Sequence, residues 1–451
     1  MSKVNKYQVR NAVIDLLLRI DKGGYSHLLI DQAIKSHQLS TKDARLLTEI
    51  VYGTVQHQIT LDYYISHFVK NNKKQQRWVT MLLRMSVYQM VYLDRVPDHA
   101  IIHEAVEIAK QRGHKGVASF VNGVLRNIQR KGVPNPQAIK DPIHRLSITT
   151  SHPEWLIQRW IELYGKEKTA KMCTANLERN PMSIRVQPLK IPRQEAMERL
   201  KEEGFHIKPS LFSSQGIVIE EGNVLTSSLF KKGLITIQDE SSMLVGEMLD
   251  VSPGMTVLDA CSAPGGKTTH IAEKMADQGI IHAYDIHEKK TKLVQEKAKQ
   301  LQLSIIYAEQ ADARDLNAIH KEETFDRIVV DAPCTGFGVM RAKPDIKYRK
   351  KEKDIHQLAT IQLEILNSVA SLLKKDGLLI YSTCTVDRKE NEGVVKQFLK
   401  THENYKVDPR FFATLPSEMR DSPGMSNVGL QIFPQTFQTD GFFLTRFIRT
   451  S

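Results

Sequence analysis

Two spacings of apolar residues divide this chain of 451 residues. In the region 1–140, apolar residues recur every three or four positions, which is the spacing of amphipathic helices. In the region 233–451, short apolar runs alternate with stretches of helical spacing, which is typical of a doubly wound parallel sheet. The intervening region, 141–232, mixes both patterns. We therefore predict three domains with these limits.

The first region is predicted to be helical throughout. Its apolar side chains form stripes that suit a shared core rather than a cofactor site, because each stripe occupies one face of a helix. The stripe residues are Val13, Leu16, Leu17 and Ile20; Trp78, Met81, Leu82 and Met85; and Val117, Phe120, Val121, Val124, Leu125 and Ile128.

The middle region follows a stretch at 132–142 that holds three prolines and a glycine and is typical of a linker. Helical spacing recurs at 154–164 and 167–177, and strand-like alternation occurs at 182–187. A small α+β unit is expected here, and no residue pattern in it indicates chemistry.

Positive charge is concentrated in the helical region. It holds 21 Lys plus Arg against 10 Asp plus Glu, a net charge of +11, while the whole chain carries +12. The stretches 71–77 and 126–132 could neutralise phosphates along an RNA backbone. A solvated basic surface explains either stretch alone, but the excess over the whole region favours RNA binding.

Composition excludes several classes of protein. With 41% hydrophobic and 25% charged residues, the chain is typical of a soluble globular protein. No apolar run approaches the roughly 20 residues that span a membrane, and the N-terminus does not resemble a secretory signal, so we expect a cytoplasmic protein. The four cysteines show no C-x-x-C spacing, which argues against a disulfide framework and a metal site.

Five predicted strands of the last region end in acids or thiols. In open α/β sheets, ligands bind beyond the carboxyl ends of the parallel strands, so these side chains are expected to converge on one site. The residues at or just after the strand ends are Asp259, Asp285, Asp312, Asp331 with Cys334, and Cys384.

The turn after the first of these strands has the sequence DACSAPGGKTTH. It is not a phosphate-binding P-loop, because Cys261 stands where that loop needs its first glycine. Nor is it the dinucleotide fingerprint, since Gly265 and Gly266 are adjacent and no third glycine follows. A nucleoside cofactor fits better, with Asp285 on the ribose hydroxyls and Asp312 near the adenine amino group. S-adenosylmethionine meets this description, and a purely structural glycine turn is the alternative.

Two cysteines beside such a cofactor indicate a particular reaction. Carbon 5 of cytosine is too weak a nucleophile to accept a methyl group directly, but a thiolate that adds to carbon 6 activates it. The reaction then needs an acid near the ring and a second group that assists release. Cys384, Asp331 and Cys334 could supply these roles, although the chemistry does not choose between the two thiols. Cys173 is interpreted as a small buried hydrophobe.

Four motifs then carry a resemblance to a known family: DACSAPGGKTTH, VVDAPCTGFGVMRAKPD, YSTCTVDRKENE and TDGFFLTRF. In this order they are similar to the motifs of the RNA (cytosine-5) methyltransferases of the Sun family. The domain order is similar to that of bacterial ribosomal RNA members of the family. The resemblance implies a Rossmann-like S-adenosylmethionine-dependent methyltransferase domain, preceded by an all-α NusB-like RNA-binding domain and a small α+β domain.

The resemblance also implies a role for each motif residue. Cys384 would attack carbon 6, and Cys334 would assist release of the methylated base. Asp331 would stand between cofactor and base, with Asp285 on the ribose and Asp312 near the adenine. Arg341, Pro344 and Asp345 would help to hold the target base. The residues expected to wrap the cofactor are Cys261, Ser262, Ala263, Pro264, Gly265, Gly266 and Lys267.

The expected substrate is a cytosine of 16S ribosomal RNA, free or in a partly assembled small subunit, with no membrane and no obligate protein partner. The base must be exposed or extruded to meet both thiol and cofactor. Alternatives are the same chemistry on another RNA such as tRNA, or a non-catalytic RNA-binding factor resembling an antiterminator. A nucleotide hydrolase is disfavoured by the missing P-loop glycine.

Overall fold

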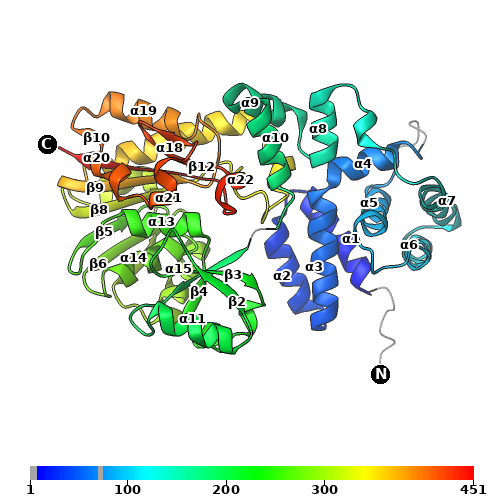
Figure 1. Ribbon diagram of the computed structural model, residues 1–451, viewed down its shortest axis with the longest axis horizontal. Helices are drawn as coiled ribbons and strands as arrows, with labels where there is room; N and C mark the ends of the chain where they lie inside the picture. Colours follow the sequence, from blue (N-terminus) through cyan, green and yellow to red (C-terminus); the bar gives the residue numbers. More distant parts are fainter. Residues whose placement is uncertain (1–7, 70–74, 180, 451) are drawn as a thin grey trace. The chain divides into compact units, whose positions relative to one another are not determined.

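The computed structural model describes residues 8–69, 75–179 and 181–450. The chain divides into two compact units. The first joins 1–177 to the inserted segment 340–350, and the second joins 178–339 to 351–451. Helices dominate the first unit, whereas the second contains the sheets (Figure 1).

The first unit is built on the apolar stripes predicted from the sequence. Val13, Leu82 and Val121 are fully buried in one continuous core, while Trp78 and Phe120 lie partly buried at its edge. The predicted helical character is confirmed. The helices are α1 (Gln8–Asp21), α2 (Ser26–Ser36), α3 (Thr41–Gln56), α4 (Gln58–Ser66), α5 (Arg77–Tyr92), α6 (Asp98–Arg112) and α7 (Lys115–Lys131).

The predicted linker leads into three further helices of the same unit. Asp141 caps the first of them by accepting a hydrogen bond from the His144 backbone N–H, and Pro142 occupies a position where its missing N–H costs nothing. The boundaries between the three predicted domains stay a prediction. The structure groups the three helices that follow the linker with the helical unit. These elements are the short 3₁₀ helix η1 (Pro136–Ala138), α8 (Pro142–Thr150), α9 (Glu154–Tyr164) and α10 (Lys166–Ala175).

The inserted segment 340–350, which includes α17 (Ile346–Arg349), is held inside the helical unit by polar contacts. The Asp345 carboxylate accepts a 2.5 Å hydrogen bond from the Ser26 hydroxyl on α2. The buried Lys347 side-chain nitrogen donates to the backbone carbonyl of Gln56 at 2.9 Å. Burial lowers the pKa of Lys347 to about 7. Gln56 is the last residue of α3, where backbone carbonyls lack a partner within the helix.

A small antiparallel sheet opens the second unit, with its strands in the order β2-β3-β1-β4 in the described part of the chain. Helix α11 packs its apolar face, with Ala196 and Leu200, into the core of this sheet. The predicted α+β character of the middle region is confirmed. The elements are β1 (Met182–Val186), α11 (Arg193–Glu202), β2 (His206–Pro209), β3 (Gly216–Glu221), η2 (Val224–Thr226), α12 (Ser228–Lys231) and β4 (Ile235–Ile237).

The larger sheet is the predicted doubly wound one. Among the described residues its order is β11-β12-β13-β9-β8-β5-β6-β7, with β10 paired to β13. Strands β5 to β9 run parallel, β13 runs antiparallel to β9, and the winding direction reverses between β5 and β8. The strands are β5 (Thr256–Asp259), β6 (Ile280–Asp285), β7 (Ile306–Gln310), β8 (Phe325–Asp331), β9 (Leu373–Thr383), β10 (Tyr405–Val407), β11 (Met425–Ser426), β12 (Gly429–Ile432) and β13 (Phe442–Arg449).

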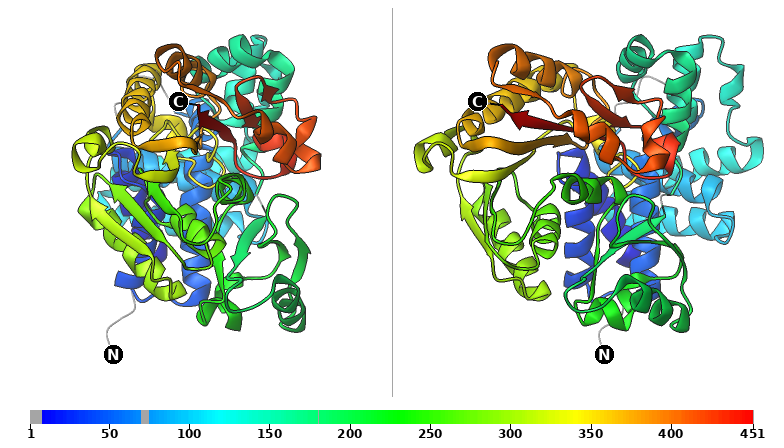
Figure 2. Two further views of the ribbon diagram at one scale, coloured as in Figure 1. Left: turned by 90° about the vertical axis from the view of Figure 1, so that its left-hand side faces the viewer. Right: turned by 60° about the vertical axis from the view of Figure 1, so that its left-hand side comes forward.

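Helices cover both faces of this sheet (Figure 2). Successive strand residues point to opposite faces, so Val257 joins the core under α13 and α14, while Leu258 joins the core under α18 and α19. In the described part of the chain, none of the helices could cross a membrane. The helices are α13 (Glu240–Met248), α14 (Gly266–Lys274), α15 (Glu288–Leu301), η3 (Ala313–Asp315), α16 (Leu316–Ile319), α18 (Glu352–Ala370), α19 (Glu392–Thr401), α20 (Pro409–Thr414), α21 (Ser417–Arg420) and α22 (Pro434–Phe437).

Candidate active site

The strand-end acids and thiols lie along the carboxyl edge of the large sheet, beside the reversal point between β5 and β8. Asp259 ends β5 and Asp331 ends β8, and these strands are hydrogen-bonded neighbours. Asp285 ends β6 on the other side of β5, while Asp331 is paired with Ser382 of β9, two residues before Cys384. This is the position at which doubly wound sheets bind ligands.

The two cysteines face each other across neighbouring strand ends. The Sγ atoms of Cys334 and Cys384 are 3.3 Å apart, and both side chains are half-buried. The backbone N–H of Gly338 donates to the Cys384 carbonyl at 2.9 Å, which ties the two thiol loops together. The hydrogen bond with Cys384 and then burial raise the pKa of Cys334 well above its ordinary value. Cys334 is therefore a protonated thiol at neutral pH.

An ion pair lies beside the thiols. Lys267 Nζ contacts a carboxylate oxygen of Asp331 at 2.8 Å, and the Ser382 hydroxyl donates to the other oxygen at 2.8 Å. Burial lowers the pKa of Lys267, but Asp331 outweighs this effect and an ionised Cys384 adds to it, so the pKa lies above its usual value. Lys267 thus supplies a permanent positive charge next to Asp331 and within electrostatic reach of Cys384.

The glycine turn between β5 and α14 is shaped by its surroundings. Gly265 has a φ of +95°, and a Cβ there would approach Val294 Cα to 3.1 Å, so a larger residue would be strained. The turn is fixed from below by the Thr268 hydroxyl, which donates to the buried Asp259 carboxylate at 2.7 Å. Burial raises the pKa of Asp259 to about 6. The first backbone N–H groups of α14 are thereby held at the sheet edge.

The other predicted acids differ in their partners. Asp285 accepts a hydrogen bond from the His287 backbone N–H at 3.0 Å and lies 3.8 Å from the Lys290 ammonium. Asp312 instead pairs with Arg314, whose Nη2 lies 2.6 Å from the carboxylate, and this contact lowers the pKa of Asp312. An adenine amino group at Asp312 would therefore share the carboxylate with a guanidinium.

Ile286 also lies at this edge of the sheet and was not predicted from the sequence. Its side chain is 49% exposed although it directly follows the strand-end acid Asp285. A large apolar residue exposed beside a carboxylate and a helix N-terminus fits a ligand with an apolar ring and a polar sugar. These residues fit S-adenosylmethionine, and the available signal was an apolar residue that continues past the end of β6.

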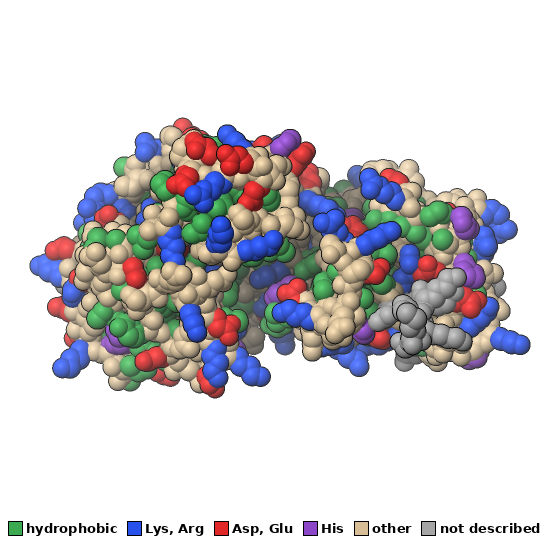
Figure 3. All heavy atoms as spheres, turned by 90° about the horizontal axis from the view of Figure 1, so that it is seen from below, with side chains coloured by type: hydrophobic (Ala, Val, Ile, Leu, Met, Phe, Trp, Pro, Cys, Tyr) green, Lys and Arg blue, Asp and Glu red, His purple; other side chains and the backbone are tan. Residues whose placement is uncertain are grey.

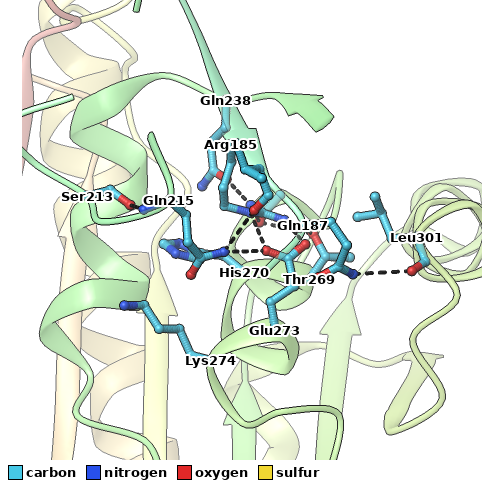
Figure 4. A network of polar contacts seen from close by, with 12 residues as sticks. Arg185, Gln187, Ser213, Gln215, Gln238, Thr269, His270, Glu273, Lys274 and Leu301 are labelled. Atoms are coloured by element: carbon cyan, nitrogen blue, oxygen red, sulfur yellow. Dashed lines mark hydrogen bonds and ion pairs between the residues drawn. The ribbon is translucent and has the colours of Figure 1, made fainter. Parts of the chain in front are cut away.

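The middle region, in which no residue pattern indicated chemistry, contains a buried arginine that supports the glycine turn (Figure 4). Arg185 of β1 is fully buried and binds both carboxylate oxygens of Glu273 on α14, at 2.7 and 2.8 Å. The same guanidinium donates to the Gly266 carbonyl at 2.8 Å, and Gln215 donates to Glu273 at 2.8 Å. The small sheet thus holds the helix that carries the turn.

Arg341, Pro344 and Asp345, which were expected to help hold the target base, lie in the inserted segment that groups with the helical unit. Their role toward the base stays a prediction. Asp345 is only 2% exposed and binds Ser26, so its carboxylate serves the packing of that unit. A sequence gives no sign that a loop acid is buried against a residue more than 300 positions earlier.

A doubly wound sheet with a glycine turn, strand-end acids and two adjacent thiols at its carboxyl edge fits the class of S-adenosylmethionine-dependent methyltransferases. The chain belongs to the RsmB/F family of 16S rRNA methyltransferases, whose family model matches residues 247–448. The NusB family model matches residues 7–130, and the ferredoxin-like domain model of RsmF/B-like methyltransferases matches residues 152–225.

Known proteins resemble the chain over nearly its whole length or over its larger part. The probable ribosomal RNA small subunit methyltransferase B of Bacillus subtilis strain 168 is 47% identical over 442 residues, which is 98% of both chains. The crystal structure of PH0851 is 29% identical, covers 99% of both chains and superposes with a TM-score of 0.83. NSun6 from Pyrococcus horikoshii, solved with SFG, is 23% identical and shares the fold, with a TM-score of 0.59 over 66% of this chain and 98% of its own.

Proposed function

We propose that this enzyme methylates carbon 5 of a specific cytosine in 16S ribosomal RNA, with Cys384 as the nucleophile. The observation that carries the proposal is the pair of thiols 3.3 Å apart beside the Lys267–Asp331 ion pair. Two thiols at one cofactor site suit a reaction that forms and then breaks a bond to the substrate.

In the first step, the Cys384 thiolate attacks carbon 6 of the cytosine, and the ring electrons make carbon 5 nucleophilic. The positive charge of Lys267 favours the thiolate form of Cys384, because opposite charges stabilise each other in a half-buried site. Asp331 holds Lys267 in place. Asp331 itself would lie at the boundary between cofactor and base. S-adenosylmethionine supplies the methyl group, and residues 261–267 with Asp285 and Asp312 would bind it.

In the second step, the carbon 5 proton leaves and the carbon 6–sulfur bond breaks. Cys334 gives its own proton to the departing sulfur of Cys384 and receives the proton from carbon 5. The electron pair of the C5–H bond restores the ring double bond, and Cys384 leaves as a thiol. The raised pKa of Cys334 keeps a proton next to the leaving sulfur, which supports this role.

Three variants test the chemistry. Cys384→Ala should abolish methyl transfer while leaving RNA binding in a gel-shift assay intact, because the nucleophile is lost and the fold is kept. Cys334→Ala should trap a covalent protein–RNA adduct, seen as a slow band on a denaturing gel. If that band persisted in the Cys334→Ala, Cys384→Ala double variant, the assignment of Cys384 as nucleophile would be wrong.

The helical unit is proposed to anchor the RNA that flanks the target base. Helix α7 contains no Asp or Glu and exposes Arg126, Arg130 and Lys131, which suits contacts to phosphates. On the face shown in Figure 3, basic side chains are interspersed with acidic ones rather than gathered in one patch. Of the basic stretch 71–77, residues 71–74 lie outside the described residues.

The target is proposed to be free or partly assembled 16S RNA in the cytoplasm, reached without an obligate protein partner. The named relative from Bacillus subtilis, similar over 98% of the chain, supports the choice of small-subunit RNA. The cytosine must be single-stranded or flipped out, because the thiol attacks from the face of the ring. The same chemistry on another RNA, such as tRNA, is an outcome of the mapping experiment below.

A further inference from the structure

Two consecutive buried residues, Glu390 and Asn391, contact the chain on either side of the two thiols. They lie between β9 and α19, and neither side chain is exposed. We propose that Glu390 positions Cys334 for release of the product and that Asn391 positions Cys384 for attack. This inference rests on the proposed roles of the two thiols.

Glu390 holds the residue that follows Cys334. The backbone N–H of Thr335 donates to Glu390 Oε2 at 2.9 Å, and the Thr335 hydroxyl contacts Oε1 at 2.5 Å. A carboxyl that binds both polar groups of one residue fixes its backbone and side chain together. The direction in which the Cys334 side chain leaves the backbone is thereby set by Glu390.

Gln362 of α18 extends the same support to the residue before Cys334. Its amide nitrogen donates to Glu390 Oε2 at 3.0 Å and to the Pro333 carbonyl at 2.9 Å. Both chain neighbours of Cys334 are therefore joined to one buried carboxyl, directly or through one amide.

Asn391 does the same for Cys384. Its side-chain oxygen accepts a hydrogen bond from the Thr383 hydroxyl at 2.6 Å, and its side-chain nitrogen donates to the Thr385 carbonyl at 3.1 Å. Thr383 and Thr385 are the two residues that flank Cys384. The two supports meet where the hydroxyls of Thr335 and Thr385 lie 2.8 Å apart.

The burial of Glu390 carries a cost that packing alone does not explain. Burying a carboxyl away from water is unfavourable unless its oxygens find donors, and burial raises the pKa of Glu390 to about 7. Its donors are residues of the thiol loop and the glutamine that supports that loop. The hydrogen bonds of the buried Glu390 carboxyl therefore fix the position of Cys334, and they do not serve the packing of the apolar core.

The proposal predicts different defects for the two residues. Loss of Glu390 should displace Cys334 and slow release, so Glu390→Ala should behave like Cys334→Ala and accumulate covalent adduct. Loss of Asn391 should displace Cys384 and slow attack, so Asn391→Ala should form less adduct in the Cys334→Ala background. A displacement of about 1 Å can cost on the order of 10²-fold in rate.

The experiment incubates each full-length variant with S-adenosylmethionine and 16S RNA from a strain that lacks the gene, and follows adduct with time on denaturing gels. We expect Glu390→Ala to accumulate adduct at least about tenfold above the unaltered protein. Glu390→Gln should accumulate no more adduct than the unaltered protein, because the glutamine amide can accept a hydrogen bond from the Thr335 N–H and donate one to the Thr335 hydroxyl. Glu392→Gln is the matched control, since this neighbouring acid pairs with Arg388 and Lys396 instead.

Binding of S-adenosylhomocysteine checks that each variant is folded. If Glu390→Ala does not fold, Thr335→Val removes the same hydroxyl contact and should also accumulate adduct. A folded Glu390→Ala or Thr335→Val without extra adduct would overturn the role of Glu390, and a normal rate of adduct formation with Asn391→Ala would overturn that of Asn391. If Cys334→Ala itself traps no adduct, the proposed roles of the thiols fail and this inference fails with them.

Discussion

At the scale of single residues, ionisable side chains around the thiols respond to different neighbours. Lys267 keeps its charge because Asp331 offsets the effect of burial, and Cys334 keeps its proton because the hydrogen bond with Cys384 and then burial raise its pKa. Asp259, beneath the glycine turn, is buried without a cation in direct contact among the described residues. The site therefore combines the positive charge of Lys267, the neutral thiol of Cys334 and the raised pKa of Asp259.

The raised pKa of Asp259 predicts a dependence of stability on pH. Its folded-state pKa of about 6 exceeds the unfolded value, so the burial cost is absent below about pH 4 and complete above about pH 6. Asp259→Asn lacks this cost, and its advantage in the free energy of unfolding should grow to about 3 kcal/mol by pH 8. Urea denaturation at several pH values measures this difference.

The exposed Asp421→Asn is the matched control for Asp259→Asn, and its stability difference should not follow the same trend. If the stability advantage of Asp259→Asn stayed constant between pH 5 and pH 8, the raised pKa of the buried Asp259 would be contradicted.

The residues predicted from the sequence were those at strand ends, because the position after an apolar run is visible in one dimension. Cys334, Cys384 and Asp331 were predicted in this way, and the structure brings them to one edge of the sheet. Glu390 and Arg185 were not found, since a charged residue in a sequence is normally interpreted as solvated. Their burial depends on partners that are distant in the chain.

At the scale of elements, the small antiparallel sheet supports the glycine turn between β5 and α14. Arg185 of β1 joins the Gly266 carbonyl at the start of α14 to the Glu273 carboxylate further along that helix (Figure 4). Removing one partner of a buried ion pair leaves the other uncompensated. The position of α14, and of the N–H groups at its start, therefore depends on the small sheet.

Arg185→Lys tests this dependence. Lysine keeps the charge beside Glu273 but cannot form the bidentate pair and also reach Gly266, so at least one charged hydrogen bond is lost. We expect a loss of about 2 kcal/mol in stability and roughly tenfold weaker binding of S-adenosylhomocysteine. Thermal unfolding and calorimetric titration measure the two effects.

Arg199→Lys is the control for Arg185→Lys, because Arg199 forms an exposed ion pair with Glu195 on α11 of the same small domain. If Arg185→Lys lowered the stability but left the affinity for S-adenosylhomocysteine unchanged, Arg185 would contribute to folding alone.

Most elements could be predicted because their spacing is local. The stripes of α1, α5 and α7 and the strands β5 to β9 follow directly from the periods of apolar residues. The inserted segment 340–350 could not be predicted, since its burial depends on Ser26 and Gln56, far earlier in the chain. Local patterns define elements, but long-range partners decide which unit a segment joins.

At the scale of the whole molecule, the chain combines a basic helical unit with a methyltransferase sheet. The charge imbalance predicted the RNA-binding class, and the family membership agrees with an enzyme that modifies ribosomal RNA. The inserted segment leaves the thiol-bearing unit just after the Cys334 loop, joins the helical unit, and returns before α18. The two units are therefore linked three times by the chain, at 177–178, 339–340 and 350–351.

The most direct test of the proposed function is to map 5-methylcytosine by bisulfite sequencing of total RNA. The comparison uses a strain that lacks this protein, with and without the gene restored. We predict that methylation at one cytosine of 16S RNA disappears in the deletion strain and returns with the restored gene, but not with a gene encoding Cys384→Ala. Unchanged methylation at every 16S cytosine, or loss at a cytosine in tRNA instead, would contradict the proposed substrate.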